Sequence, residues 1–324
     1  MVVAVREVLE VRGNPDLAEV YVARLREDPR TLVEFVDSID PRFPREEKWV
    51  VTVSTQFGCP MRCAMCDSGD HYIGNLTADE ILSEIDHVVK KRAPSGKIDC
   101  PKFKIQFARM GEPSLNPGVL EVLEKLPIVY DAPGLMPCIA SIAPRAGKNW
   151  FEKLMEIKNR MYPGGRFQLQ FSINTTSEDV RNRLMPASKW NFEQIAEYGE
   201  RFHETSDRRI TLNFVLAKNL PVDPKKVRSI FSPEHFIIKL TPLNPTDVAR
   251  ANNLMPTLTP SAPNAADDLA VEFENLDFDC IVSIGAEEEI RIGSNCGQAV
   301  ARWRRLEAVE SMQGTGVLSG ARLD

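Results

Sequence analysis

The chain has 324 residues, 43% of them hydrophobic and 27% charged, so it can bury the core of one α/β domain or of two smaller ones. Its formal net charge of −6 argues against a broadly basic surface, so we expect no DNA partner, although a local basic patch is compatible with this total. No segment has about 18 uninterrupted apolar residues, and Arg6 and Glu7 interrupt the apolar N-terminus. We therefore expect a cytoplasmic protein without a membrane partner.

The N-terminal residues 1–47 have a mostly helical pattern and are predicted to form a short helical segment. Strand-like and helix-like stretches alternate after it, which is typical of βα units around a parallel sheet. The first predicted strand is Trp49 to Thr55. A helix follows in "NLTADEILSEIDHVVKKR", because Thr77 can cap it with Glu80 three residues on, and apolar residues repeat at helical spacing.

Five more stretches are predicted as strands, namely "KFKIQFA", "CIASIA", "RFQLQFSIN", "RITLNFVL" and "HFIIKLT". Helical stretches separate them, such as "NPGVLEVLEKL", "NWFEKLMEIKNR" and "NFEQIAEYGERFHE". Six βα units are too few for a closed eight-stranded barrel. We therefore predict an α/β fold whose core, residues 48–245, is a partial, open (βα)6 barrel.

Residues 246–324 are predicted to be a C-terminal extension. The stretch from Pro242 to Pro263 carries five prolines and is expected to be a long loop. After it, "FDCIVSIG" and "EIRIG" are predicted as a strand pair that leads into "SNCGQAV" and a last helix.

Three of the seven cysteines, Cys59, Cys63 and Cys66, lie within eight positions of one another, just after the first predicted strand. Thiolates are soft ligands that suit zinc, copper(I) or iron-sulfur clusters. A structural zinc needs a fourth ligand, for which His71 is the nearby candidate. A four-iron cluster held by three cysteines would instead leave one iron open for a substrate or cosubstrate. A non-enzymatic zinc or iron-sulfur module is therefore one hypothesis, and an enzyme is the other.

The spacing Cys59-x-x-x-Cys63-x-x-Cys66 at the end of a first strand resembles the signature of radical S-adenosylmethionine (SAM) enzymes. This resemblance implies a [4Fe-4S] cluster on these three cysteines, SAM on the open iron and cleavage of SAM to a 5'-deoxyadenosyl radical. It also implies a low-potential electron donor of the flavodoxin or ferredoxin type.

A finer resemblance covers most of residues 50–300. The stretches "STQFGCPMRCAMCDSG", "NLTADEI", "RMGEPSLNP", "LNP" and "SNCGQAV" are similar to the RlmN/Cfr family of radical SAM RNA methyltransferases. The resemblance implies SAM contacts by residues that follow predicted strands: Gly111, Glu112, Ser141, Ser172, Ile173, Asn174 and Asn244. All of them lie at the carboxyl ends of predicted strands, which is where the active sites of barrel enzymes are found.

In this family the cysteine of Cys-Gly-Gln is methylated by one SAM and passes a methyl-derived carbon to an sp2 carbon of an adenine in RNA. The resemblance gives that relay role to Cys296. It also suggests that Glu34, in "LVEFVDSID", is the general base that removes a proton when the adduct collapses.

Two departures from the family change the expected substrate. Thr52 stands where RlmN and Cfr carry the second cysteine that releases the adduct, so Cys138, Cys280 or an external thiol must take that role, or the product differs. We also expect the family's N-terminal RNA-binding domain to be missing or cut to a short helical segment. We therefore expect a small molecule or a protein as substrate rather than RNA, and a radical SAM reaction without methyl transfer stays a second hypothesis.

Overall fold

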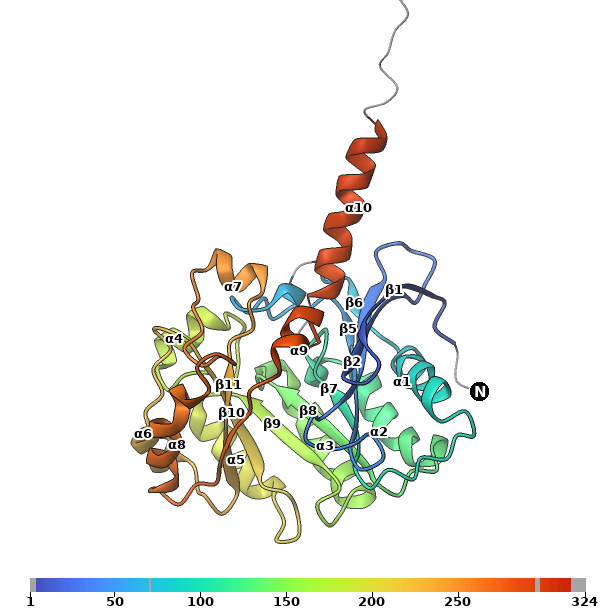
Figure 1. Ribbon diagram of the computed structural model, residues 1–324. Helices are drawn as coiled ribbons and strands as arrows, with labels where there is room; N and C mark the ends of the chain where they lie inside the picture. Colours follow the sequence, from blue (N-terminus) through green and yellow to red (C-terminus); the bar gives the residue numbers. More distant parts are fainter. Residues whose placement is uncertain (1–3, 70, 295–297, 316–324) are drawn as a thin grey trace, which may run out of the picture.

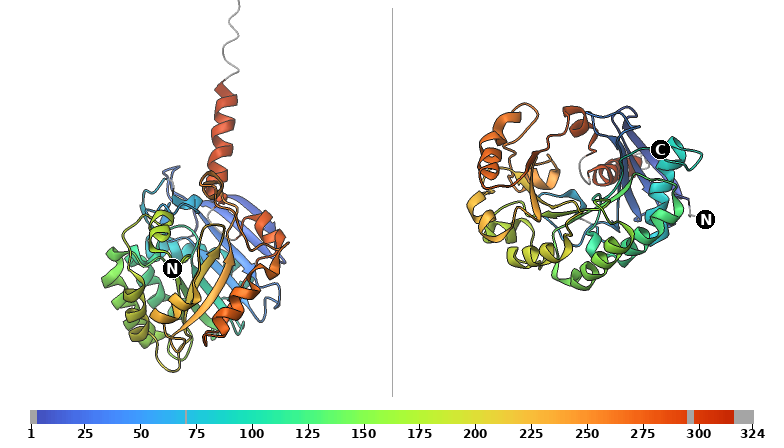
Figure 2. Two further views of the ribbon diagram at one scale, coloured as in Figure 1. Left: turned by 90° about the vertical axis from the view of Figure 1, so that its left-hand side faces the viewer. Right: turned by 90° about the horizontal axis from the view of Figure 1, so that it is seen from below.

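The computed structural model describes residues 4–69, 71–294 and 298–315. One ten-stranded sheet bends into an open arc, with helices along its outer face, as the end-on view shows most clearly (Figures 1 and 2). The strand order in this sheet is β1-β2-β3-β4-β7-β8-β9-β10-β11-β12, and β5 and β6 form a separate pair.

The strands are β1 (Glu7–Asn14), β2 (Ala18–Arg24), β3 (Leu32–Ile39), β4 (Trp49–Val53), β5 (Gln56–Phe57), β6 (Gly74–Asn75), β7 (Phe103–Phe107), β8 (Leu135–Ser141), β9 (Gln168–Ser172), β10 (Ile210–Leu216), β11 (Phe236–Pro242) and β12 (Cys280–Val282). The α-helices are α1 (Ala78–Arg92), α2 (Pro117–Val129), α3 (Lys148–Met161), α4 (Glu178–Leu184), α5 (Phe192–Phe202), α6 (Pro224–Ile230), α7 (Asp247–Ala251), α8 (Asp267–Glu274), α9 (Glu287–Ile292) and α10 (Ala299–Thr315).

The six predicted barrel strands are present as β4 and β7 to β11, and each pairs in parallel with its neighbour. This confirms the α/β fold with a partial barrel. The structure adds β12, which pairs in parallel with β11 and extends the sheet beyond the predicted six strands.

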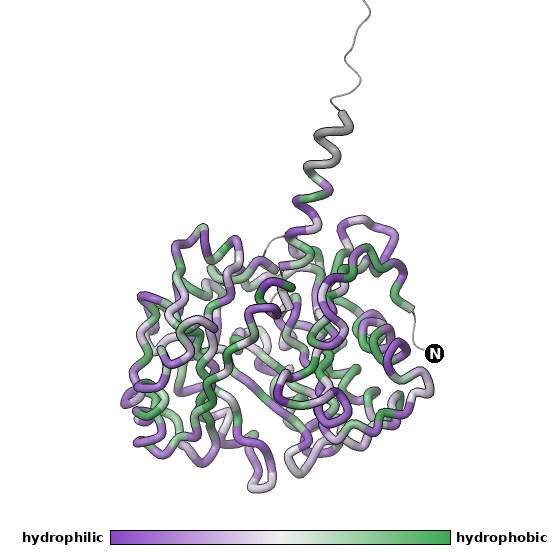
Figure 3. The backbone as a smooth tube through the Cα atoms, in the orientation of Figure 1, coloured by the Kyte–Doolittle hydropathy of each residue, from purple (hydrophilic) through white to green (hydrophobic). Residues whose placement is uncertain are grey.

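The two faces of the barrel strands differ sharply. The outer face carries apolar residues such as Ile105 and Phe171, which pack with the helices in one large core. The inner face carries polar, partly exposed residues such as Thr52, Gln106 and Lys239. In the hydropathy view, hydrophobic segments follow the strands and hydrophilic ones gather on the outer loops (Figure 3). The interior of the arc, which we call the lumen, is therefore polar.

Helix α1 forms as predicted. Thr77 accepts a hydrogen bond from the backbone of Glu80, and the Glu80 side chain accepts one from the Thr77 backbone, which completes the capping box. Its apolar face, including Ile81, Ile85 and Val88, joins the core outside the sheet.

The prediction of a helical N-terminal segment is wrong. Residues 7–39 form β1, β2 and β3, which are joined in antiparallel order and continue the sheet from β4. β-branched and aromatic residues fill these strands, for example in "AEVYVAR", and favour an extended backbone once β4 offers an edge for pairing. The boundaries of the three predicted units stay predictions, although the sheet continues across both of them.

The predicted second strand of the C-terminal pair, "EIRIG", is also wrong. Glu287–Ile292 form helix α9, in which the Glu289 side chain accepts a hydrogen bond from the Ala286 backbone and Gly293 ends the helix at φ 81°. The proline-rich stretch contains the short helix α7, and a last helix, α10, follows as expected and extends away from the body (Figure 1).

Candidate active site

The three clustered cysteines lie on the loop that follows β4 and β5, at the carboxyl edge of the sheet. Backbone contacts from distant segments fix this loop: Ala64 N donates to Leu184 O (2.8 Å), and Thr246 Oγ1 donates to Met65 O (3.0 Å). Apolar side chains pack around it, including Ile142, Leu184, Met185 and Leu243. The loop is therefore held in a partly buried, largely apolar setting.

The three thiols of this loop are suited to binding a metal cluster, because positive charge beside them stabilises their thiolate forms. All three are free, and burial raises the pKa of Cys63 to about 12 and raises the pKa values of Cys59 and Cys66. Neighbouring thiols add to the shifts of the Cys59 and Cys63 pKa values, and the carboxylates of Asp67 and Glu34 add to that of Cys66. Bound iron would offset that cost by stabilising the thiolates. Three soft donors on one loop, in an apolar setting, fit an iron-sulfur cluster.

A mononuclear zinc site fits less well. Among the described residues, no three His, Cys, Asp or Glu side chains converge on a point that could hold one metal ion. The zinc hypothesis needs His71 beside the cysteines, whereas a cluster binds each thiolate to a different iron and so does not need the sulfur atoms to meet at one point.

Glu112 and Ser141 come together from the ends of two neighbouring strands. Glu112 Oε1 accepts hydrogen bonds from Ser141 Oγ (2.6 Å) and Ser114 Oγ (2.7 Å), and its Oε2 accepts one from Ile142 N (3.1 Å). Burial raises the pKa of this carboxyl, although these donors oppose the shift. The network fixes the carboxylate beside the cysteine loop.

Gly111 allows the backbone to pass close to the cysteine loop. Its φ is 103°, and a Cβ here would lie 2.6 Å from Thr55 Oγ1 and 2.7 Å from Gln56 Cβ. Position 111 therefore requires glycine, both for its conformation and for space.

Ser172, Ile173 and Asn174 follow β9 as the resemblance implies. Asn174 has φ 65° and donates from Nδ2 to Met185 Sδ (3.3 Å), next to the cysteine loop. Its Oδ1 is buried and has no hydrogen-bond partner among the described residues. A buried, unsatisfied acceptor is rare and fits a group that binds a ligand. Asn244 follows β11 at the same edge of the sheet.

Cys296 lies outside the described residues, but the segments on both sides of it are fixed. Arg109 donates from Nη2 to Gly293 O (2.7 Å) and from Nη1 to Ser294 O (2.6 Å). Glu34 Oε2 accepts a hydrogen bond from Val300 N (2.8 Å). These contacts hold the chain just before and just after the Cys-Gly-Gln segment.

Arg109 and Glu34 also bind each other. Arg109 Nε lies 2.5 Å from Glu34 Oε1, and the two side chains are 1% and 0% exposed. Burial raises the pKa of Glu34, and Arg109 opposes that shift. The sequence analysis missed Arg109, whose only local signal is its position directly before "MGEP".

The structure places Cys138 and Cys280, the two candidate replacements for the family's second cysteine, on opposite faces of the sheet. Thr52, Gln106 and Cys138 are aligned in register across β4, β7 and β8, so Cys138 faces the lumen at the level of Thr52. Cys280 aligns with Ile238 of the apolar outer face and packs against the outer core. Cys138 is thus the lumenal thiol of the two.

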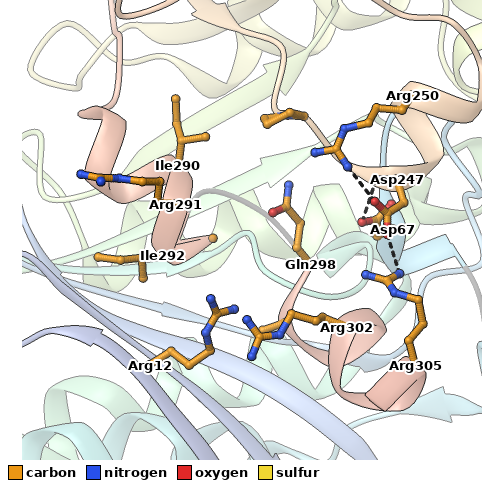
Figure 4. A pocket seen from close by; sticks show the side chains of 13 residues that line it. Arg12, Asp67, Asp247, Arg250, Ile290, Arg291, Ile292, Gln298, Arg302 and Arg305 are labelled. Carbon is orange, nitrogen blue, oxygen red and sulfur yellow. Dashed lines mark hydrogen bonds and ion pairs between the residues drawn. The ribbon is translucent and has the colours of Figure 1, made fainter. Parts of the chain in front are cut away.

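A pocket of about 340 Å³ opens beside Gln298, two residues after Cys296 (Figure 4). Side chains from β1, α7, α9 and α10 surround it. Five arginines contribute to its lining: Arg12, Arg250, Arg291, Arg302 and Arg305.

No protein-family model matches the chain. It is 29% identical over 204 residues to the "Probable dual-specificity RNA methyltransferase RlmN" of Treponema denticola, which covers 59% of this chain and 52% of that protein. It is 24% identical over 308 residues to the protein with the same description in Chlorobium phaeobacteroides, covering 90% of this chain and 79% of that one. The matched part thus spans about half of the first relative and most of the second.

The fold has a counterpart among solved structures. The crystal structure of a radical SAM methyltransferase from Sphaerobacter thermophilus superposes with a TM-score of 0.69 at 17% identity, over 90% of this chain and 80% of that one. In the described part of the chain, no helix combines the length and apolar character needed to cross a membrane.

Proposed function

We propose that the chain, which is similar to the RlmN/Cfr family of radical SAM methyltransferases, transfers a methyl-derived carbon to an sp2 carbon of its substrate through Cys296. The observation that supports this most directly is the convergence at one edge of the sheet of the cysteine loop, the Glu112 network and the residues that flank the Cys296 segment, Ser294 and Val300. When bound, the cluster and SAM supply the 5'-deoxyadenosyl radical.

The protein's own residues bind and orient in this proposal. Cys59, Cys63 and Cys66 hold the [4Fe-4S] cluster. Gly111, Glu112, Ser141, Ser172, Ile173, Asn174 and Asn244 line the SAM site. The unsatisfied Asn174 Oδ1 is available to accept a hydrogen bond from SAM, and the Gly111 backbone leaves room for its amino-acid end.

Cys296 accepts the methyl group in the first half of the reaction. Its thiolate attacks the methyl carbon of one SAM, a carbon-sulfur bond forms, the sulfonium-methyl bond breaks, and S-adenosylhomocysteine leaves. Arg109 and Glu34 keep the segment in place through its backbone. In the proposed base role of Glu34, Arg109 stabilises the buried carboxylate before the reaction, and the carboxylate becomes neutral when it takes the proton.

We propose Cys138 as the thiol that releases the product. Its sulfur attacks the Cys296 sulfur, a disulfide forms, and the carbon-sulfur electron pair passes to the product carbon, which takes a proton. The two thiols are oxidised as the transferred carbon is reduced, and an external dithiol then restores them. The lumenal position of Cys138, in register with Thr52, supports this role, and the nearby Lys104 ammonium favours the thiolate against the effect of burial.

The proposal is tested by anaerobic reconstitution with iron, sulfide and SAM, using a low-potential donor such as a flavodoxin or a ferredoxin. We expect a four-iron protein that forms 5'-deoxyadenosine and gains one methyl group on the Cys296 peptide, and Cys296→Ala should lose only the methyl group. Tightly bound zinc without SAM cleavage would favour the non-enzymatic module. SAM cleavage without methylation would favour radical chemistry without methyl transfer.

A further inference from the structure

The arginine pocket beside Gln298 concentrates positive charge on a chain with a formal net charge of −6. Five guanidinium groups line it, together with two carboxylates, Asp67 and Asp247. In the close-up view, Gln298 lies at the centre, with Arg12 and Arg302 on one side and Arg250 on the other (Figure 4). The cationic groups come from β1, α7, α9 and α10, which are far apart in the sequence, and this pocket brings them together.

Arg12 and Arg302 share a single carboxylate. Arg302 Nη2 donates to Glu10 Oε1 (2.8 Å), and Arg12 Nε lies 3.6 Å from the same oxygen. Burial and the charge of Arg302 lower the pKa of Arg12, while Glu10 opposes the shift. Two like charges beside one carboxylate leave a net positive charge, which attracts an anion.

The other arginines of the pocket show the same imbalance. Asp247 lies between Arg250 Nη1 (2.7 Å) and Arg305 Nη1 (2.6 Å), so a second pair of guanidinium groups shares one carboxylate. Arg291 is exposed and forms no ion pair with the described residues. The five arginines thus exceed the three surrounding carboxylates, Glu10, Asp67 and Asp247, by two charges.

We propose that this pocket binds one phosphate group of the substrate, through Arg12 and Arg302. A guanidinium presents paired N–H donors whose geometry matches phosphate oxygens, and each contact with Glu10 leaves further donors on the group. Gln298 joins the pocket to the Cys296 segment, so a phosphate held here brings the rest of a small substrate toward that segment. This assignment depends on the proposed function in one respect, namely that the phosphate belongs to the substrate of the proposed reaction.

The dimensions favour a small phosphorylated molecule over a nucleic-acid strand. A volume of about 340 Å³ lies at the lower end of the range for small-molecule sites. A strand needs a row of cations that follows its successive phosphates, whereas the positive charges described here surround one pocket.

Binding is measured on the full chain saturated with S-adenosylhomocysteine. This ligand occupies the SAM site, so that probes containing adenine cannot bind there. The probes are AMP, adenosine and a short RNA oligonucleotide. We expect AMP to bind at least about ten-fold more tightly than adenosine, and Arg12→Gln and Arg302→Gln each to weaken AMP binding about ten-fold. Arg302→Lys, which keeps the charge but loses the fork, should weaken it less.

Arg201→Gln is the matched control, since Arg201 lies on α5 in an exposed ion pair with Glu152 outside the pocket. Equal binding of AMP and adenosine, or unchanged AMP binding in both pocket variants, would overturn the phosphate site. Much tighter binding of the oligonucleotide, with a steep salt dependence, would overturn the assignment to a small molecule. SAM cleavage by the unmodified chain is measured separately, so loss of the proposed function and loss of this site give different results.

Discussion

Glu34 on β3 and Arg109 after β7 form a fully buried ion pair, and each also binds the backbone on one side of the Cys296 segment. Gly293, whose backbone Arg109 binds, lies 184 positions after Arg109 in the sequence. The pair therefore holds Gly293 and Val300, which lie on either side of the predicted relay in the sequence.

Removing one partner of this pair should loosen the relay segment. We expect Arg109→Met to destabilise the protein by about 3 to 5 kcal/mol, because it leaves the Glu34 charge buried without a partner. Chemical denaturation measures this loss, and hydrogen exchange of the peptide that contains Cys296 should accelerate. Arg201→Met, which breaks an exposed pair, should cost at most about 1 kcal/mol. The double variant Arg109→Met, Glu34→Gln should lose less than the sum of the single changes, and strict additivity would contradict the coupling.

Replacement of Gly111 by a larger residue should weaken SAM binding, because the added side chain crowds its neighbours as well as straining the backbone. In Gly111→Ala the new Cβ meets Thr55 and Gln56, whereas Gly96 has φ 76° and nothing within 4 Å of its Cβ position. Gly96→Ala should therefore cost about 1 to 2 kcal/mol of stability, and Gly111→Ala should cost more and weaken SAM binding. Calorimetric titration of both variants checks this, and equal SAM affinity in the two would refute the crowding argument.

The lumenal thiol should be needed for product release. We expect Cys138→Ala to retain methylation of Cys296 but to accumulate enzyme covalently joined to substrate, which intact-protein mass spectrometry detects. Cys280→Ala is the control, because Cys280 packs against the outer core. Normal turnover by Cys138→Ala without an added thiol would exclude the release role of Cys138.

Lys239 should make stability depend on pH in the alkaline range. Burial, with a contribution from Lys104, lowers its pKa from 10.5 to about 8. A lowered pKa means that the folded state favours the neutral amine, so its contribution to stability is present above pH 10.5 and is lost as the pH falls through about 8. The difference in unfolding free energy between Lys239→Met and the unmodified chain should shrink by up to about 3 kcal/mol between pH 7 and pH 10.5. Denaturant titrations across this range measure it, and a constant difference would show that Lys239 keeps its ordinary pKa.

The sequence predicted the barrel strands and α1 because their information is local. Alternation such as that in "RFQLQFSIN" and the Thr77–Glu80 capping box depend on neighbouring residues. The strands β1 to β3 were missed because they depend on pairing with one another and, through β3, with β4. Helix α9 does not follow from "EIRIG" because the stretch is short and the bond that caps the helix, from Ala286 N to the Glu289 side chain, needs a residue outside that stretch.

The candidate site likewise combines residues that the sequence could indicate with contacts that depend on the tertiary structure. Glu112 and Ser141 could be placed at strand ends by resemblance, and the structure brings them together. The pairing of Arg109 with Glu34 and the arginine pocket arise from tertiary contacts between remote segments, so no spacing in the sequence announces them.

The clamp around the Cys296 segment also implies an order of maturation. The cysteine loop is synthesised well before residues 293, 294 and 300, whose backbone groups Arg109 and Glu34 bind. The contacts on this side of the loop therefore form only after residue 300 has been made. Until then the three thiols face an unfinished side of the barrel, and this is the period in which the proposed cluster would be inserted.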